Sequence, residues 1–141
     1  RSSAASDVYK RQDLNMEEMI KRDAHKFDEA CVQFAKTFPK IIREIRAVNP
    51  DVKIYADNIY NPAKGIDAFS QVYSVADAYI NRMNRGFYPS DEYVLVDIKK
   101  CFDGEKESMV NLSFKGREID PHPSEKGHKK IAQMVIKAME R

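Results

Sequence analysis

Two short apolar runs separated by an amphipathic stretch constrain the fold of this chain more than any other feature. The runs are residues 52–59, Val-Lys-Ile-Tyr-Ala-Asp-Asn-Ile, and residues 93–98, Tyr-Val-Leu-Val-Asp-Ile. Their β-branched and aromatic residues are typical of strands, and the second run is apolar enough to be covered on both faces. Strands that alternate with helices run parallel, so the sequence predicts a layered α/β fold with a parallel sheet.

A long amphipathic helix is predicted before the first strand, over residues 15–49. Its apolar residues recur every three or four positions and so form one buried face. They are Phe27, Cys31, Phe34, Phe38, Ile41, Ile42, Ile45 and Val48. Pro39 interrupts this pattern, and two interpretations are open. Either Pro39 opens a second helix capped by Thr37, or it kinks one long helix.

Two further helices are predicted, one between the strands and one at the end of the chain. The first has an apolar face from Phe69 to Met83, and Gly86 suits the residue just after its end. The last begins after Ser124, a candidate N-cap. Its apolar face comprises Ile131, Ala132, Val135, Ile136 and Met139. Residues 99–119 show no clear period and are expected to be a long functional or mobile connection.

The first twelve residues are interpreted as foreign to the fold. Residues 7–12, Asp-Val-Tyr-Lys-Arg-Gln, resemble the translated end of a sequencing adaptor, so residues 1–12 are treated as a non-native segment. They carry a net charge of +2, which is the whole formal net charge of the chain. Residues 13–141 are therefore neutral and offer no basic surplus for nucleic acid. No apolar run approaches the roughly 20 residues that span a membrane.

The stretch that points to chemistry is Asp-Pro-His-Pro, residues 120–123. Pro121 and Pro123 fix their own φ and donate no backbone hydrogen bond, so they hold the segment stiff and non-helical. A histidine on a rigid loop, braced by a carboxylate, suits a general base. The catalytic candidates are therefore His122 and Asp120. The alternative for His122 is a loop histidine with a local hydrogen bond, and His128 is expected to be a packing or capping residue.

A family resemblance strengthens this interpretation. The block Asp-Pro-His-Pro-Ser-Glu-Lys-Gly-His-Lys-Lys-Ile-Ala resembles the last sequence block of the GDSL/SGNH hydrolases, which reads Asp, a short spacer, His-Pro-Asn, then Gly-His or Gly-Tyr and an apolar helix. The resemblance implies a Ser-His-Asp triad with His122 as base and Asp120 as its acid. Family members commonly place the acid three residues before the histidine, where this chain has Ile119. Glu118 is the alternative acid.

The same resemblance implies a fold and a function. The fold is a flavodoxin-like three-layer sandwich of parallel strands, and residues 13–141 correspond to the C-terminal part of that single domain. The family's Gly-Asp-Ser-Leu nucleophile block and its oxyanion-donor blocks are absent, so they are expected in a missing N-terminal half. The parent protein would be an esterase or lipase for small acyl esters of lipids or carbohydrates, without cofactor or metal. The alternative is a non-catalytic α/β interaction module.

Overall fold

The computed structural model describes residues 16–111 and 120–141, apart from the side chains of residues 16–23 and 68. The elements in chain order are α2 (Met16–Val48), β1 (Tyr55–Asp57), the 3-10 turn η1 (Asp67–Phe69), α3 (Ser70–Asn84), β2 (Val94–Val96), α4 (Ile98–Asp103) and α5 (Glu125–Met139). The two strands pair in parallel, with Tyr55 opposite Val94 and Asp57 opposite Val96. The predicted α/β class and the parallel strands are confirmed.

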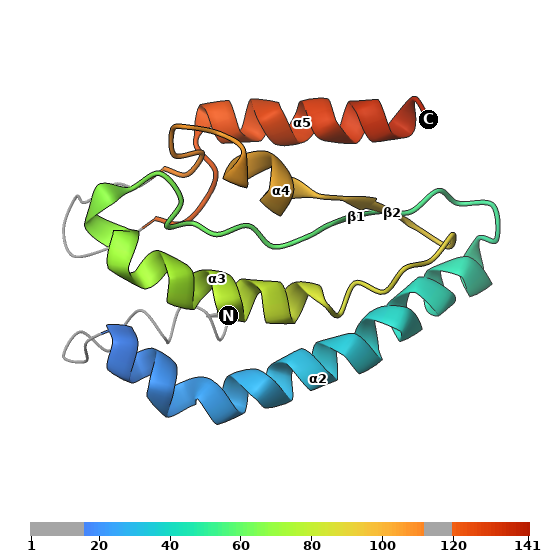
Figure 1. Ribbon diagram of the computed structural model, residues 1–141. Helices are drawn as coiled ribbons and strands as arrows, with labels where there is room; N and C mark the ends of the chain where they lie inside the picture. Colours follow the sequence, from blue (N-terminus) through green and yellow to red (C-terminus); the bar gives the residue numbers. More distant parts are fainter. Residues whose placement is uncertain (1–15, 112–119) are drawn as a thin grey trace.

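Helices lie on both sides of the two strands (Figure 1). Helix α5 lies on one side, and α3 and α2 lie on the other. One buried cluster joins β2, α4 and the segment before α5, and it consists of Val96, Ile98, Phe102 and Met109. A second cluster joins α2 to the start of β2 and consists of Phe38, Ile42 and Tyr93. The described residues form a mixed α/β unit with a two-stranded sheet, which is not a flavodoxin-like sandwich.

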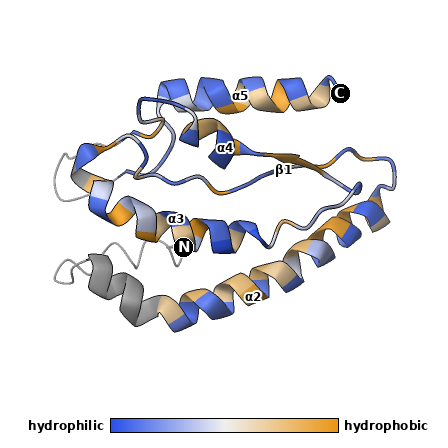
Figure 2. Cartoon of the chain, in the orientation of Figure 1, coloured by the Kyte–Doolittle hydropathy of each residue, from blue (hydrophilic) through white to orange (hydrophobic). Residues whose placement is uncertain are grey.

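The expectation that the second strand is covered on both faces is wrong. Val94 and Leu95 point to opposite faces of the sheet, and they are 43% and 41% exposed. Of the three residues of β2, only Val96, at the end that packs on α4 and α5, is buried. Apolar residues continue toward the C-terminal end of α5 (Figure 2), where Ile136 and Met139 are exposed. The strands and α5 therefore carry apolar surface that the described residues leave uncovered.

Helix α2 runs through Pro39 without a break, so the first interpretation, a second helix that opens at Pro39, is wrong (Figure 1). Its buried face is shorter than predicted. Phe38 and Ile42 are buried against Tyr93, but Ile41, Ile45 and Val48 are exposed. The periodic apolar pattern predicted the helix correctly, but it did not predict how much of the apolar face is buried by other elements.

The region expected to lack regular structure contains the short helix α4. Asp97 caps it by accepting a hydrogen bond from the backbone N–H of Lys100 at 3.0 Å.

The role predicted for Gly86, at the end of α3, also differs from what the structure shows. Gly86 has no positive φ, and a Cβ at this position would overlap the ring of Phe34. Gly86 is therefore needed for close packing between α3 and α2 and not for a left-handed helix end.

Helix α5 begins where predicted, but the face that packs is different. Ser124 is its N-cap, and its hydroxyl oxygen accepts from the backbone N–H of Gly127 at 3.1 Å. The residues that pack on the core are Ile131, Met134, Val135 and Ala138. Ala132, Ile136 and Met139, which were expected on the buried face, are exposed.

Candidate functional site

The structure brings Asp120 and His122 into direct contact, and these two residues form an acid–base dyad. The ring nitrogen Nδ1 of His122 lies 2.5 Å from Oδ1 of Asp120, and the backbone N–H of His122 donates to the same oxygen at 3.0 Å. Oδ2 of Asp120 accepts from the side-chain amide of Asn111 at 3.4 Å. The backbone hydrogen bond, followed by the ring hydrogen bond, lowers the pKa of Asp120 from its ordinary value of 3.8. Asp120 is therefore ionised at neutral pH.

The charge on Asp120 determines which nitrogen of His122 carries the proton. An ionised carboxylate only accepts hydrogen bonds, so Nδ1 must be the donor and Nε2 of the neutral ring is unprotonated. The side chain of His122 is 81% exposed. None of the described residues hydrogen-bonds to Nε2. One ring nitrogen is thus held and the other can accept a proton, which is the arrangement of a general base.

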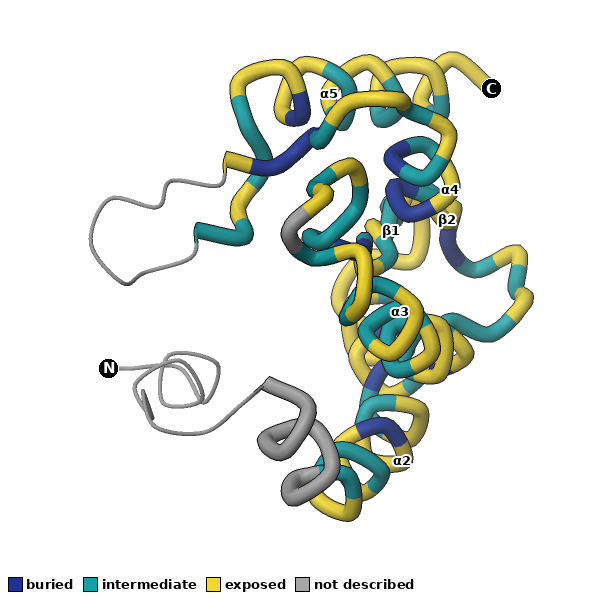
Figure 3. The backbone as a smooth tube through the Cα atoms, turned by 60° about the vertical axis from the view of Figure 1, so that its left-hand side comes forward, coloured by how far each residue is buried: buried dark blue, intermediate teal, exposed yellow. Residues whose placement is uncertain are grey.

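Backbone pairing holds the dyad loop, residues 120–123, against the segment just before residue 112. The N–H of Asn111 donates to the carbonyl of His122 at 2.7 Å, and the N–H of Ser124 donates to the carbonyl of Met109 at 2.8 Å. The Ser124 hydroxyl donates to the same Met109 carbonyl at 3.1 Å. Because Met109 is buried, the loop is anchored to the core and does not hang free in solvent. Figure 3 shows buried backbone at the start of α5.

Gly127 allows the first turn of α5 to approach this segment. The residue is buried, and a Cβ there would overlap the carbonyl oxygen of Met109 and lie 3.0 Å from Cβ of Pro123. Glycine is therefore required at position 127, because α5 lies in close contact with the backbone that anchors the dyad loop.

Replacing Gly127 by alanine should lower the free energy of unfolding by about 1–3 kcal/mol. The Met109 carbonyl accepts both hydrogen bonds from Ser124, so it cannot move away without weakening them. Urea unfolding followed by circular dichroism measures the change. Gly104→Ala is the matched control, because a Cβ there meets Cys101 O at an ordinary 3.5 Å and φ is −76°. Equal stability of the two variants would contradict the close-contact explanation.

The remaining sequence candidates are either outside the described residues or away from this pair. The alternative acid Glu118 and the adaptor-like residues 1–12 lie outside the described residues. His128 is exposed on α5, so the expectation of a packed or capping side chain is not confirmed. Within the described part of the chain, no three His, Cys, Asp or Glu side chains gather to hold a metal ion. None of its helices has the length and apolar character needed to cross a membrane.

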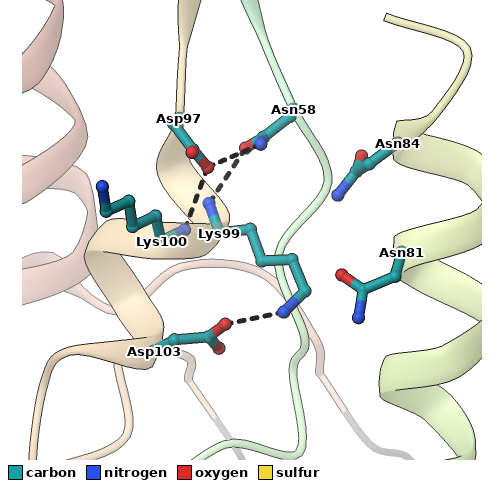
Figure 4. Close-up of a pocket in the computed structure, with 7 residues that line it drawn as sticks. All are labelled: Asn58, Asn81, Asn84, Asp97, Lys99, Lys100 and Asp103. Carbon is teal, nitrogen blue, oxygen red and sulfur yellow. Dashed lines mark hydrogen bonds and ion pairs between the residues drawn. The ribbon is translucent and has the colours of Figure 1, made fainter.

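A second polar cluster, which sequence reasoning missed, lies where both strands end (Figure 4). Asn58 follows β1 and Asp97 follows β2, and the amide of Asn58 donates to Oδ1 of Asp97 at 2.7 Å. The backbone N–H of Lys99 donates to the side-chain carbonyl of Asn58 at 2.9 Å. The cavity beside them has a volume of about 310 Å³. It is lined by Asn58, Asn81, Asn84, Asp97, Lys99, Lys100 and Asp103.

Lys99 is the centre of this cluster and is only 9% exposed. Its Nζ lies 2.6 Å from Oδ2 of Asp103 and 2.8 Å from Oδ1 of Asp77. Burial acts to lower the pKa of Lys99, but the hydrogen bonds to the two carboxylates outweigh it and raise the pKa. Burial likewise acts to raise the pKa of Asp77, but hydrogen bonds from Lys99 and Asn61 outweigh it and lower the pKa.

The partners of Lys99 show what this cluster does. Asp77 belongs to α3 and Asp103 to α4, so the ammonium group ties the two helices together. Among the described residues, every buried side-chain nitrogen and oxygen has a hydrogen-bond partner. Because these polar groups satisfy one another, we assign the cluster a structural role and place the chemistry at Asp120 and His122.

Comparisons with protein-family models, with curated proteins and with solved structures give no significant match. The basis for a function is therefore the geometry of the dyad and the sequence block that contains it.

Proposed function

We propose that this chain carries the base and the acid of a GDSL/SGNH-type serine hydrolase that cleaves acyl esters through an acyl-serine intermediate. The observation that supports the proposal is the 2.5 Å contact between Nδ1 of His122 and Oδ1 of Asp120 at the entry to α5. It joins the two residues to which the sequence block assigns these roles. Asp120 takes the place of the acid despite its shorter spacing from the histidine.

The proposed mechanism assigns one proton path to His122. Nε2 accepts the proton of the serine hydroxyl as Oγ attacks the ester carbonyl, and it then gives that proton to the departing alkoxide. Water attacks the acyl-serine in the second half, and Nε2 again takes and returns the proton. Asp120 holds Nδ1–H throughout and stabilises the imidazolium that forms. The substrate is a small acyl ester of a lipid or a carbohydrate.

The nucleophile and oxyanion donors are proposed to come from an N-terminal half of the same domain. Two features support this. A two-stranded parallel sheet is marginal by itself, and Val94 and Leu95 leave both of its faces partly uncovered. The side chain of His122 is likewise 81% exposed, as a base that awaits its nucleophile would be. We propose that β1 and β2 are one side of a larger parallel sheet that this N-terminal half completes.

A comparison of two polypeptides tests the proposal. The 141-residue chain should hydrolyse p-nitrophenyl acetate no faster than buffer, because a base without nucleophile and oxyanion donors loses most transition-state stabilisation. The same chain joined to its upstream coding sequence should hydrolyse it with an acyl-enzyme burst. No turnover by the longer protein would overturn the proposal. Turnover by the short chain that His122→Ala removes would overturn the assignment of the nucleophile to a missing half.

One observation favours the alternative of a non-catalytic interaction module. The hydrogen bonds of Asp120 to the backbone and ring of His122 also stiffen the entry to α5, a role that needs no chemistry. In that case the longer protein would show neither a burst nor turnover, so the same experiment separates the two functions.

A further inference from the structure

A tyrosine that is distant in the sequence forms a hydrogen bond with the dyad loop. The hydroxyl of Tyr60 donates to the carbonyl of Pro121 at 2.7 Å across 61 residues of chain. Tyr60 lies three residues beyond the end of β1, and its ring packs on Phe102 with centroids 4.9 Å apart. Phe102 is among the most deeply buried side chains of the described residues. The hydroxyl is therefore presented to the loop from the core.

The carbonyl that Tyr60 holds belongs to the peptide unit that also fixes Asp120. The C=O of Pro121 and the N–H of His122 are the two ends of one planar peptide. The C=O end accepts from Tyr60, and the N–H end donates to Oδ1 of Asp120. Rotation of this peptide would break both hydrogen bonds at once. The same Oδ1 accepts from Nδ1 of His122, so the orientation of the ring depends on the peptide in turn.

We propose that Tyr60 is a positioning residue of the candidate site, whose hydroxyl fixes the Pro121–His122 peptide and through it the Nδ1–H tautomer of His122. Without this hydroxyl the peptide is held at its N–H end only, and that end is bonded to a carboxylate that is itself partly exposed. Tyr60 does not touch the reacting atoms, and its role as a positioning residue for hydrolysis rests on the proposed function.

The test uses the 141-residue chain and a spectroscopic readout that does not involve hydrolysis. Nitrogen-15 NMR of the imidazole rings in alkaline buffer gives the ratio of Nδ1–H to Nε2–H tautomers for each histidine. Tyr60→Phe should lower this ratio at His122 by roughly twofold to tenfold, the factor that corresponds to one net hydrogen bond. The exposed His25 and His128 serve as internal references and should not change.

Tyr73→Phe is the matched control, since it removes a hydroxyl that bonds Asp103 at 3.5 Å in the other polar cluster. It should leave the His122 ratio unchanged. An unchanged ratio in Tyr60→Phe would overturn the proposal. Loss of the cooperative thermal transition in Tyr60→Phe would also overturn it, because the hydroxyl would then hold the fold and not the dyad. Failure of the hydrolysis experiment does not affect this ratio, so the two proposals can fail separately.

Discussion

In the longer hydrolase of the proposed function, replacing His122 by alanine should lower kcat for p-nitrophenyl acetate by roughly 10⁴- to 10⁶-fold, the loss expected for the base of a catalytic triad. The alanine removes the group to which the proposed mechanism assigns the proton transfer, while the side chain it replaces is 81% exposed. The free energy of unfolding should therefore change by no more than about 0.5 kcal/mol. Stopped-flow kinetics and urea unfolding measure the two quantities.

His128→Ala provides the matched control for that experiment. His128 is another exposed histidine on the first turn of α5, and the hydrogen bonds that Asp120 accepts come from His122 and Asn111. Its replacement should leave kcat within about twofold of the unmodified protein, since surface substitutions away from special features have small effects. A His122→Ala protein that keeps its turnover, or a His128→Ala protein that loses it, would exclude the proposed base.

Replacing Lys99 by methionine should lower the free energy of unfolding by about 2–4 kcal/mol, because breaking a largely buried ion pair leaves uncompensated charge. The variant leaves Asp77 and Asp103 facing each other without the ammonium between them. Both carboxylates are less than a third exposed, so solvent screens them only partly. Lys100→Met is the control. Lys100 is the next residue of α4, exposed and outside this ion cluster, and its replacement should cost no more than about 0.5 kcal/mol.

The pH dependence of stability provides a second readout for Lys99. The folded-state pKa of Asp77 is lowered, so its contribution is present above its ordinary pKa of 3.8 and is lost as the pH falls below that value. The folded-state pKa of Lys99 is raised, so its contribution is present below 10.5 and is lost as the pH rises above that value. The stability difference between the original chain and Lys99→Met should therefore be widest between these limits. A difference that does not vary with pH would contradict the ion cluster.

The sequence predicted the elements with strong local patterns and the dyad, and it missed features that depend on packing. The β-branched runs located both strands, and Ser124 marked the start of α5, because these signals act over a few residues. Asp120 and His122 were found because they lie two residues apart in a proline-bracketed loop and match a family sequence block. Helix α4 was missed because six residues are too few to show a helical period.

Long-range contacts explain the remaining differences. Lys99 and Asp103 have a helical i,i+4 spacing that could have been recognised, but Asp77 reaches Lys99 only through the tertiary fold, across 22 residues of chain. Likewise, nothing near Tyr60 in the sequence indicates that it reaches Pro121. The exposure of Val94 and Leu95 was missed for another reason. An apolar run indicates which residues could be buried, and only the surrounding elements decide which of them are.

The backbone hydrogen bonds from Asn111 to His122 and from Ser124 to Met109 also bear on how this protein can evolve. They fix both ends of the chain segment between them. The entropic cost of closing such a segment rises only with the logarithm of its length, about 0.6 kcal/mol for each doubling. Insertions into residues 112–119 should therefore be tolerated while Asp120 and His122 stay in place.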